Sequence, residues 1–167
     1  MNAIAKRILF GAAAGLAGSI VLQGFRLGTK KLVPSAEPPI REHPGKFMLD
    51  QAEKALPRKT RRAVQQRLNG KPELMLANLL GAGYGVTFGA LLASAQAKEK
   101  RIVRDGILFG LATWAVGYLG WLPATGLMPP IWKHKPKQIV APLIEHSLYG
   151  IATAAAYQLI QKRASDT

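Results

Sequence analysis

The chain has 167 residues, a formal net charge of +14 and a mean hydropathy of +0.08. This length allows one domain, and the absence of cysteine excludes disulfides and thiolate metal sites. The charges concentrate between Arg26 and Lys71 and in short clusters around Lys98, Lys133 and Lys162, so four almost uncharged stretches remain. Each stretch approaches or exceeds the roughly 18 to 20 residues with which an α-helix crosses a bilayer. The sequence therefore predicts an all-α, four-helix transmembrane bundle in a single integral membrane domain.

The predicted spans are residues 8–25, 74–95, 102–122 and 139–160. The first resembles a signal peptide because Lys6 and Arg7 precede its apolar run. The run is longer than the usual apolar region of a signal peptide, about 7 to 15 residues, and no convincing small-residue cleavage site follows it. We therefore expect an uncleaved first helix.

The connector 26–73 is too long for a simple loop. Its proline-rich first part is expected to be largely extended. Two short amphipathic helices are expected after it, the first opening at Pro44 and the second following Pro57 and ending at Gly70. Both would lie along the membrane surface with basic outer faces, and a solvated, partly disordered loop is the alternative. The apolar positions are Phe47, Met48, Ala52 and Leu56 in the first helix and Ala63, Val64 and Leu68 in the second.

The net charge can indicate a nucleic-acid partner, because "PRKTRRAVQQR" resembles a basic binding arm. In a protein with four spans, such charges more often face anionic lipid headgroups. We expect a lipid bilayer with anionic headgroups as the partner, and no nucleic acid. The basic residues of this stretch are Arg58, Lys59, Arg61, Arg62 and Arg67.

Small residues recur at every fourth position of the second predicted span. Such spacing lets helix backbones approach closely, and van der Waals contact is a main source of helix association in lipid. A phosphate-binding loop at "GAGYG" is not favoured, because no strand precedes it. The face packs against helices of the same chain or against a second copy, which makes a homo-oligomer an open alternative. The residues are Ala77, Gly81, Gly85, Gly89 and Ala93, with shorter versions at Gly11 and Gly15, Gly106 and Gly110, and Gly150 and Ala154.

Three aromatic residues, Trp114, Tyr118 and Trp121, are spaced to lie along one side of the third span. The favoured interpretation is an interfacial belt near Trp121, with Trp114 packing deeper. A cation-binding aromatic cage is the alternative.

A turn follows the third span, in "GLMPPIW". With the histidine and the aromatic residue further along, it resembles the YagU-like family of small bacterial inner-membrane proteins. The resemblance covers residues 106–150 well and the first helix loosely. It implies a multi-span protein without an established activity and with both termini in the cytoplasm, whereas the basic residues alone do not decide the orientation. The residues that carry it are Gly126, Leu127, Pro129, Pro130, His146 and Tyr149.

Glu145 and His146 are ionisable residues in the fourth span. Pro142 is expected in the first turn of that helix, so Glu145 would cap the helix N-terminus and extend to the interface. His146 would then be a neutral residue that ties the helix to a neighbour. The alternative is a proton or ion pathway through the pair. In the relatives that the family resemblance suggests, the acidic residue lies one turn before the histidine, whereas here the two are adjacent and point about 100° apart.

No complete catalytic, metal or cofactor motif is present. Ser147 and His146 are helix neighbours that cannot face each other, and His43 and His134 lie in loops without a metal-ligand spacing. In an up-down bundle, Asp105 would lie about 20 Å or more from His146. A lipid-modifying enzyme would need a second polar cluster on facing helices, and the sequence does not show one. The sequence thus predicts no enzyme and no cofactor.

Two functions follow from these patterns. The first is an accessory or scaffolding protein of the bacterial inner membrane, whose protein partner is unknown. The second is a small proton or ion pathway that uses His146 and Glu145.

Overall fold

The computed structural model describes residues 2–68, 70–95 and 101–166, which are helical and contain no strand. Four helical segments in them are long and apolar enough to cross a membrane, which confirms the all-α, four-helix prediction. They are α1 (Ala3–Leu32), α4 (Lys71–Ala95), α5 (Ile102–Ala115) continuing through a π-helical turn (Val116–Trp121) into α6 (Leu122–Ala124), and α7 (Pro136–Ser165).

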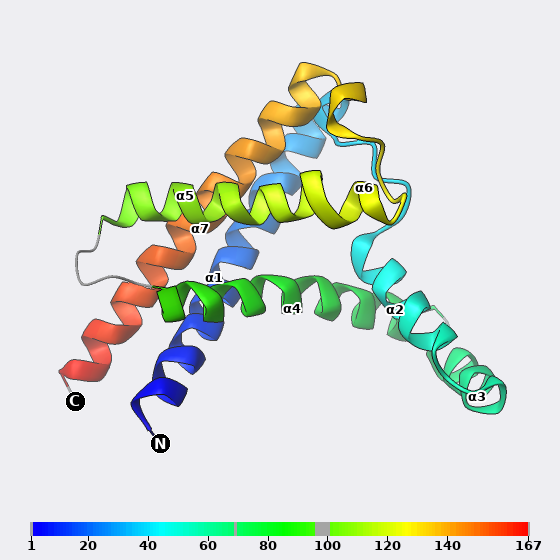
Figure 1. The fold of residues 1–167 in the computed structure, drawn as a ribbon, viewed down its shortest axis with the longest axis horizontal. Helices are drawn as coiled ribbons and strands as arrows, with labels where there is room; N and C mark the ends of the chain where they lie inside the picture. The colour runs from blue at the N-terminus through cyan, green and yellow to red at the C-terminus, as the bar shows by residue number, and fades with distance from the viewer. Residues whose placement is uncertain (1, 69, 96–100, 167) are drawn as a thin grey trace.

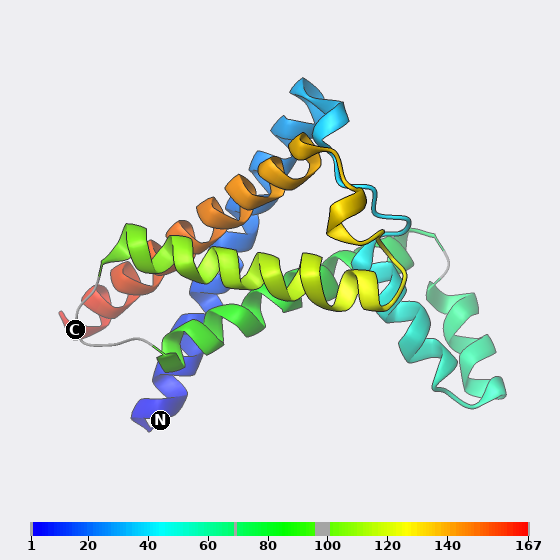
Figure 2. The ribbon, with the colours of Figure 1, turned by 45° about the horizontal axis from the view of Figure 1, so that its top comes forward.

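The helices form two crossed pairs (Figure 1). The long helices α1 and α7 lie side by side and antiparallel, while α4 crosses α1 and α5 crosses α7. The two termini lie at the same end of the molecule (Figure 1). Beyond the crossings, towards the other end of α1 and α7, these two helices diverge from α4 and α5, and Figure 2 shows the resulting wedge.

All four helical segments extend past the predicted spans, α1 and α7 at both ends. Helix α1 continues past residue 25 to Leu32, where the backbone N–H of Val33 bonds to the Thr29 carbonyl and Pro34 follows. Helix α7 begins at Pro136, before the predicted start at 139. Charged residues end an apolar stretch without ending the helical backbone, so the hydropathy pattern located the membrane segment and missed the helix ends.

Helices α1 and α4 contact each other backbone to backbone. A Cβ atom at Gly15 would collide with the carbonyl oxygen of Gly85, and one at Gly89 would collide with that of Gly11. Only glycine permits this approach, so Gly85 and Gly89 of the predicted small-residue face lie in a helix contact, whereas a Cβ at Gly81 would meet only His43 among the described residues.

The crossing of α5 and α7 repeats this arrangement with different residues. A Cβ at Gly110 would collide with the carbonyl oxygen of His146, and one at Gly150 would collide with that of Gly106. The glycines at both crossings are thus covered by helices of the same chain, and a homo-oligomer through glycine faces stays an open alternative.

The connector between α1 and α4 is helical. It contains a short 3₁₀ turn (Pro34–Ala36), α2 (Pro44–Lys54) and α3 (Arg58–Leu68), and Gly70 has the positive φ of 81° expected at a helix end. The two predicted helices are confirmed, and the disordered alternative is wrong. Together they project from the end of α4 that is remote from the termini (Figure 1).

The buried face of α2 differs from the predicted apolar one. Gly45, Leu49 and Glu53 are buried, whereas Met48 and Ala52 are exposed. The reason is again a close backbone approach, because a Cβ at Gly45 would collide with the carbonyl oxygen of Ala77 on α4.

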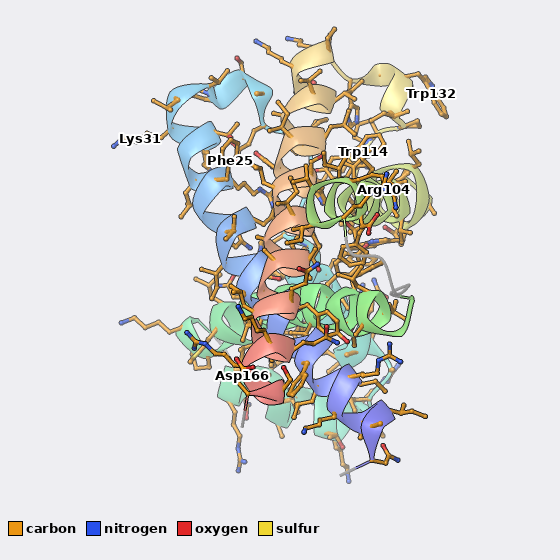
Figure 3. The ribbon with its side chains drawn as sticks, turned by 90° about the vertical axis from the view of Figure 1, so that its left-hand side faces the viewer. Phe25, Lys31, Arg104, Trp114, Trp132 and Asp166 are labelled. Carbon is orange, nitrogen blue, oxygen red and sulfur yellow. The ribbon has the colours of Figure 1, made fainter. Side chains whose placement is uncertain are left out.

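The predicted turn at Gly126 is present. Gly126 has a φ of 75°, and the backbone is extended at Pro130 before a 3₁₀ turn (Ile131–Lys133). This loop lies beside the segment after α1, because the Arg41 backbone N–H donates to the Leu127 carbonyl over 2.9 Å. The exposed Trp132 and Lys31 lie at this same end in Figure 3.

Candidate functional site

The site is a cavity of about 130 Å³ where α1 and α7 diverge from α4 and α5, which we call the wedge cavity. It is large enough for several water molecules. Four spanning segments and the start of α2 contribute polar side chains to it. These are Gln23 and Arg26 of α1, His43 before α2, Tyr84 of α4, Thr113 and Tyr118 of the α5 segment, and Glu145 and His146 of α7.

Glu145 lies deep in the molecule. Its exposed fraction is 4 %, and it stands nine residues after the first residue of α7, Pro136. At about 1.5 Å per residue, this is roughly 13 Å into the helix. The expectation that Glu145 caps the N-terminus of the helix is therefore wrong, because α7 begins earlier than predicted and Pro142 lies in its interior.

His146 is half-buried beside Glu145 and is held by its own helix. Its Nδ1 lies 2.8 Å from the Pro142 carbonyl oxygen, and its ring meets that of Tyr118 edge-on at 5.6 Å between centroids. A carbonyl only accepts, so Nδ1 carries the proton and Nε2 is left as the acceptor of the ring. The neighbouring Ser147 hydroxyl donates to the Leu143 carbonyl over 2.8 Å, and so it too is bound to α7.

Arg26 is the main residue that the sequence analysis missed. The predicted span ended at residue 25, whereas α1 continues and places Arg26, half-buried, on the wall of the wedge cavity. Arg26 is near enough to Glu145 and to His146 to act on both electrostatically. No ion pair joins Arg26 to Glu145 in the part of the chain that the structure describes. The ion pairs found there are Lys30 with Glu37, Lys46 with Glu73, and Arg104 with Asp105.

His43 is the second missed member of the cavity. It is the N-cap residue of α2, so the short loop after α1 brings it over the opening. Burial lowers the pKa of His43 below its ordinary value of 6.5, and the charge of Arg26 lowers this pKa further. The sequence shows a histidine directly before the proline that opens α2, but it does not show that this histidine lies near Arg26 of α1.

The aromatic residues of the third span do not form one belt. Trp114 and Tyr118 stack with their centroids 5.7 Å apart, whereas Trp121 turns to Tyr84 of α4 at 6.3 Å. The π-helical turn Val116–Trp121 changes the register between them. Tyr118 is buried inside the bundle, and the aromatic residue exposed near that end is Trp132. The interfacial belt near Trp121 stays a prediction.

The remaining candidates lie outside the cavity. Asp105 pairs with Arg104 at 2.9 Å, and α5 begins beside the middle of α7, since Gly106 packs against Ile151. The expected placement of Asp105 at the far end of the bundle is therefore wrong, although Asp105 does not line the cavity. His134 Nε2 lies 2.9 Å from the Pro129 carbonyl oxygen. Among the described residues no cluster of three or more metal-ligating side chains is found.

The cavity also overturns the expectation that no second polar cluster faces α7. Arg26, Tyr84 and Thr113 stand on three other helices and line the same space as Glu145. Hydropathy and spacing treat each helix alone, so they could not show this convergence.

The fold and the cavity define a multi-pass α-helical membrane protein with a polar cavity towards one end of its helix bundle. No protein-family model, no curated protein and no solved structure matches the chain.

Proposed function

We propose that the chain is a small accessory or scaffolding protein of the bacterial inner membrane, similar to the YagU-like family. The four apolar helices and the turn around Gly126 support this proposal. Both termini lie at one end of the molecule (Figure 1), as an even number of spans requires, and we place that end in the cytoplasm. The basic α3 would then contact anionic headgroups on the opposite surface.

The observation that carries the scaffolding role is the backbone contact at the helix crossings. Gly15 against Gly85, and Gly110 against His146, hold the helices at a separation that no side chain can enter. Packed interfaces of this kind have discrete arrangements and resist continuous sliding. Such a bundle has a fixed outer shape, which suits a protein that acts by presenting its surface to lipids and neighbouring proteins.

A cross-linking experiment in native membranes tests this role. We expect the wild-type chain to give a discrete cross-linked complex, and Gly89→Leu to abolish it because the α1–α4 crossing opens. Gly83→Leu is the matched control on the same helix, since a Cβ at Gly83 meets no atom within 4 Å. Glu145→Gln should retain the complex. A wild-type chain that gives no complex, or a complex unchanged in Gly89→Leu, contradicts the scaffolding role.

A proton or ion pathway is the second candidate, and the gathering of four ionisable groups in the wedge cavity favours it. These groups are Arg26, His43, Glu145 and His146. Ionisable residues at membrane depth are functional candidates. A route to the other side would have to pass Ala14 and Tyr157, which are both 0 % exposed, so conduction requires that the crossings open.

Proton flux into liposomes tests this candidate. An internal pH dye follows the response to an imposed gradient for wild type, His146→Ala and the control His134→Ala, whose ring lies outside the cavity. Flux that only His146→Ala abolishes supports a pathway. The absence of flux above empty liposomes between about pH 5 and 8, the range in which histidine titrates, eliminates it.

A further inference from the structure

The wedge cavity shares lining residues with a second space, whose lining contains no aspartate, glutamate, lysine or arginine. This space, which we call the lateral groove, has a volume of about 530 Å³, lies between α1 and α4, and shares Gln23, His43 and Gly81 with the wedge cavity. The volume lies within the range of about 300 to 1,000 Å³ that is typical of ligand sites. The charged Arg26 and Glu145 line only the wedge cavity, whereas Leu16, Ile20 and Leu27 line only the groove. This arrangement matches a molecule with a polar head and an apolar tail.

The lateral groove is positioned to open to the lipid. Its α1 side carries Leu16, Ile20 and Leu27, which are respectively 46 %, 68 % and 68 % exposed. On its α4 side, Gly81 has no side chain to fill the groove, and among the described residues an added Cβ would meet only His43, at 3.9 Å. An acyl chain can therefore lie between the two helices, and the surrounding bilayer supplies such chains at high concentration.

The polar cavity contains both signs of charge without a closed ion pair. Glu145 is 4 % exposed and Arg26 is half-buried, and no ion pair joins them within the described residues. A buried carboxylate is costly unless a cation compensates it. A head that carries a phosphate and an ammonium satisfies both groups, because the guanidinium binds phosphate oxygens in a fork and the carboxylate binds the ammonium.

The depth of the cavity agrees with a headgroup. Arg26 lies six residues before the end of α1 at Leu32, or about 9 Å along the helix. Lys31 and the exposed Trp132 stand at this same end, as Figure 3 shows, and such residues are enriched at the membrane interface. Tyr118 and Trp121 on the cavity wall add aromatic faces, which attract an ammonium group.

We propose that the chain binds one zwitterionic phospholipid of the surrounding bilayer, with its phosphate on Arg26, its ammonium beside Glu145 and an acyl chain in the lateral groove. The site goes beyond the scaffolding role and does not depend on it. It also differs from headgroup contacts of the basic α3, which would favour anionic lipids.

Native mass spectrometry of protein extracted from vesicles of equal parts phosphatidylethanolamine and phosphatidylglycerol tests the site. We expect wild type to retain one phosphatidylethanolamine molecule in preference to phosphatidylglycerol. Arg26→Gln should weaken retention of both lipids about tenfold, the order expected for loss of charged hydrogen bonds. Glu145→Gln should abolish the preference, while Lys6→Gln, an exposed charge at the opposite end of α1, should change nothing.

A second variant keeps the test decisive if Arg26→Gln unfolds. Gly81→Leu fills the space shared by the cavity and the groove, where only His43 is near, so the fold should persist and the lipid should be displaced. Four results would overturn the proposal: wild type without bound lipid, equal or greater retention of phosphatidylglycerol by wild type, Arg26→Gln and Lys6→Gln retaining lipid equally, or undiminished retention by folded Gly81→Leu.

Discussion

The glycine crossings and the wedge cavity are built from the same helices. Along α1, Gly11 and Gly15 bring α4 into backbone contact, whereas Arg26, further along, lines an open space. Along α7, Gly150 meets α5 directly, and Glu145, about one and a half turns earlier, lines that space too. Small residues let helices close on each other, and larger polar ones keep them apart. The bundle is thus close-packed at the glycine crossings and contains a cavity where the charged residues lie.

The largest effect is expected from filling a crossing. Gly89→Leu places a side chain against the Gly11 carbonyl oxygen, and we expect it to lower the free energy of unfolding by about 3 kcal/mol or more, at the upper end of the range for overpacking. Unfolding in mixed detergent micelles, followed by circular dichroism, measures it. Gly83→Leu, with no atom within 4 Å of the added Cβ, should be nearly neutral. Equal losses in the two variants would show that the crossing is not close-packed.

A smaller effect is expected from neutralising the two opposite charges of the wedge cavity, Arg26 and Glu145. Arg26→Gln and Glu145→Gln should each destabilise the fold, and the double variant should lose less than the sum, with a coupling of about 0.5 to 2 kcal/mol for groups in one electrostatic network. A double-mutant cycle of unfolding free energies measures this coupling. Strict additivity would mean that the two charges do not act on each other.

Two buried tyrosines of α7 give a matched pair. The Tyr149 hydroxyl donates to the Gly85 carbonyl over 2.9 Å, whereas the buried Tyr157 hydroxyl has no hydrogen-bond partner among the described residues. Tyr149→Phe should therefore cost about 1 kcal/mol of unfolding free energy, and Tyr157→Phe should be neutral or stabilising. The same unfolding assay compares them. A greater loss of unfolding free energy for Tyr157→Phe than for Tyr149→Phe would contradict the hydrogen bond from Tyr149 to Gly85 as a link between α7 and α4.

The smallest effect is a titration shift at the mouth of the cavity. Burial and the charge of Arg26 lower the pKa of His43 below 6.5. Between this lowered value and 6.5 the unfolded state binds more protons, so the group's contribution to stability falls as the pH drops below 6.5. Arg26→Gln should raise the midpoint towards 6.5 without reaching it, because burial is the larger cause.

Nuclear magnetic resonance of the histidine ring measures the His43 midpoint. The control is Arg41→Gln, an exposed charge on the same loop, which should leave the midpoint unchanged. A wild-type midpoint at or above 6.5, or no response to Arg26→Gln, would place His43 outside the influence of the cavity.

Much of the fold could be predicted because its signals are local. Hydropathy locates the four spans, small residues at every fourth position mark the crossings, and the positive φ of Gly126 and Gly70 follows from glycine's freedom at turns. The π-helical turn Val116–Trp121 was not predictable in this way, because no local pattern distinguishes it from the α-helix before it.

Only part of the site could be predicted from the sequence. Glu145 and His146 stand out as ionisable residues in an apolar stretch, whereas Arg26 stands at the edge of such a stretch and falls in the predicted loop. Its position on the cavity wall depends on how far α1 continues and how α1 packs on α7. Pairing across helices is a property of the tertiary structure, and one unaligned sequence does not carry it.

Cysteine labelling compares the two regions most directly, since the chain has no cysteine of its own. Gly81→Cys lines the wedge cavity, and Ala14→Cys, at a 0 % exposed position, lies in the glycine-packed region. In sealed vesicles, a membrane-impermeant thiol reagent should label Gly81→Cys only when it is added on the side of the α1 C-terminus, and should not label Ala14→Cys from either side. Labelling of both positions, or of neither, would contradict a one-sided polar cavity above a close-packed crossing.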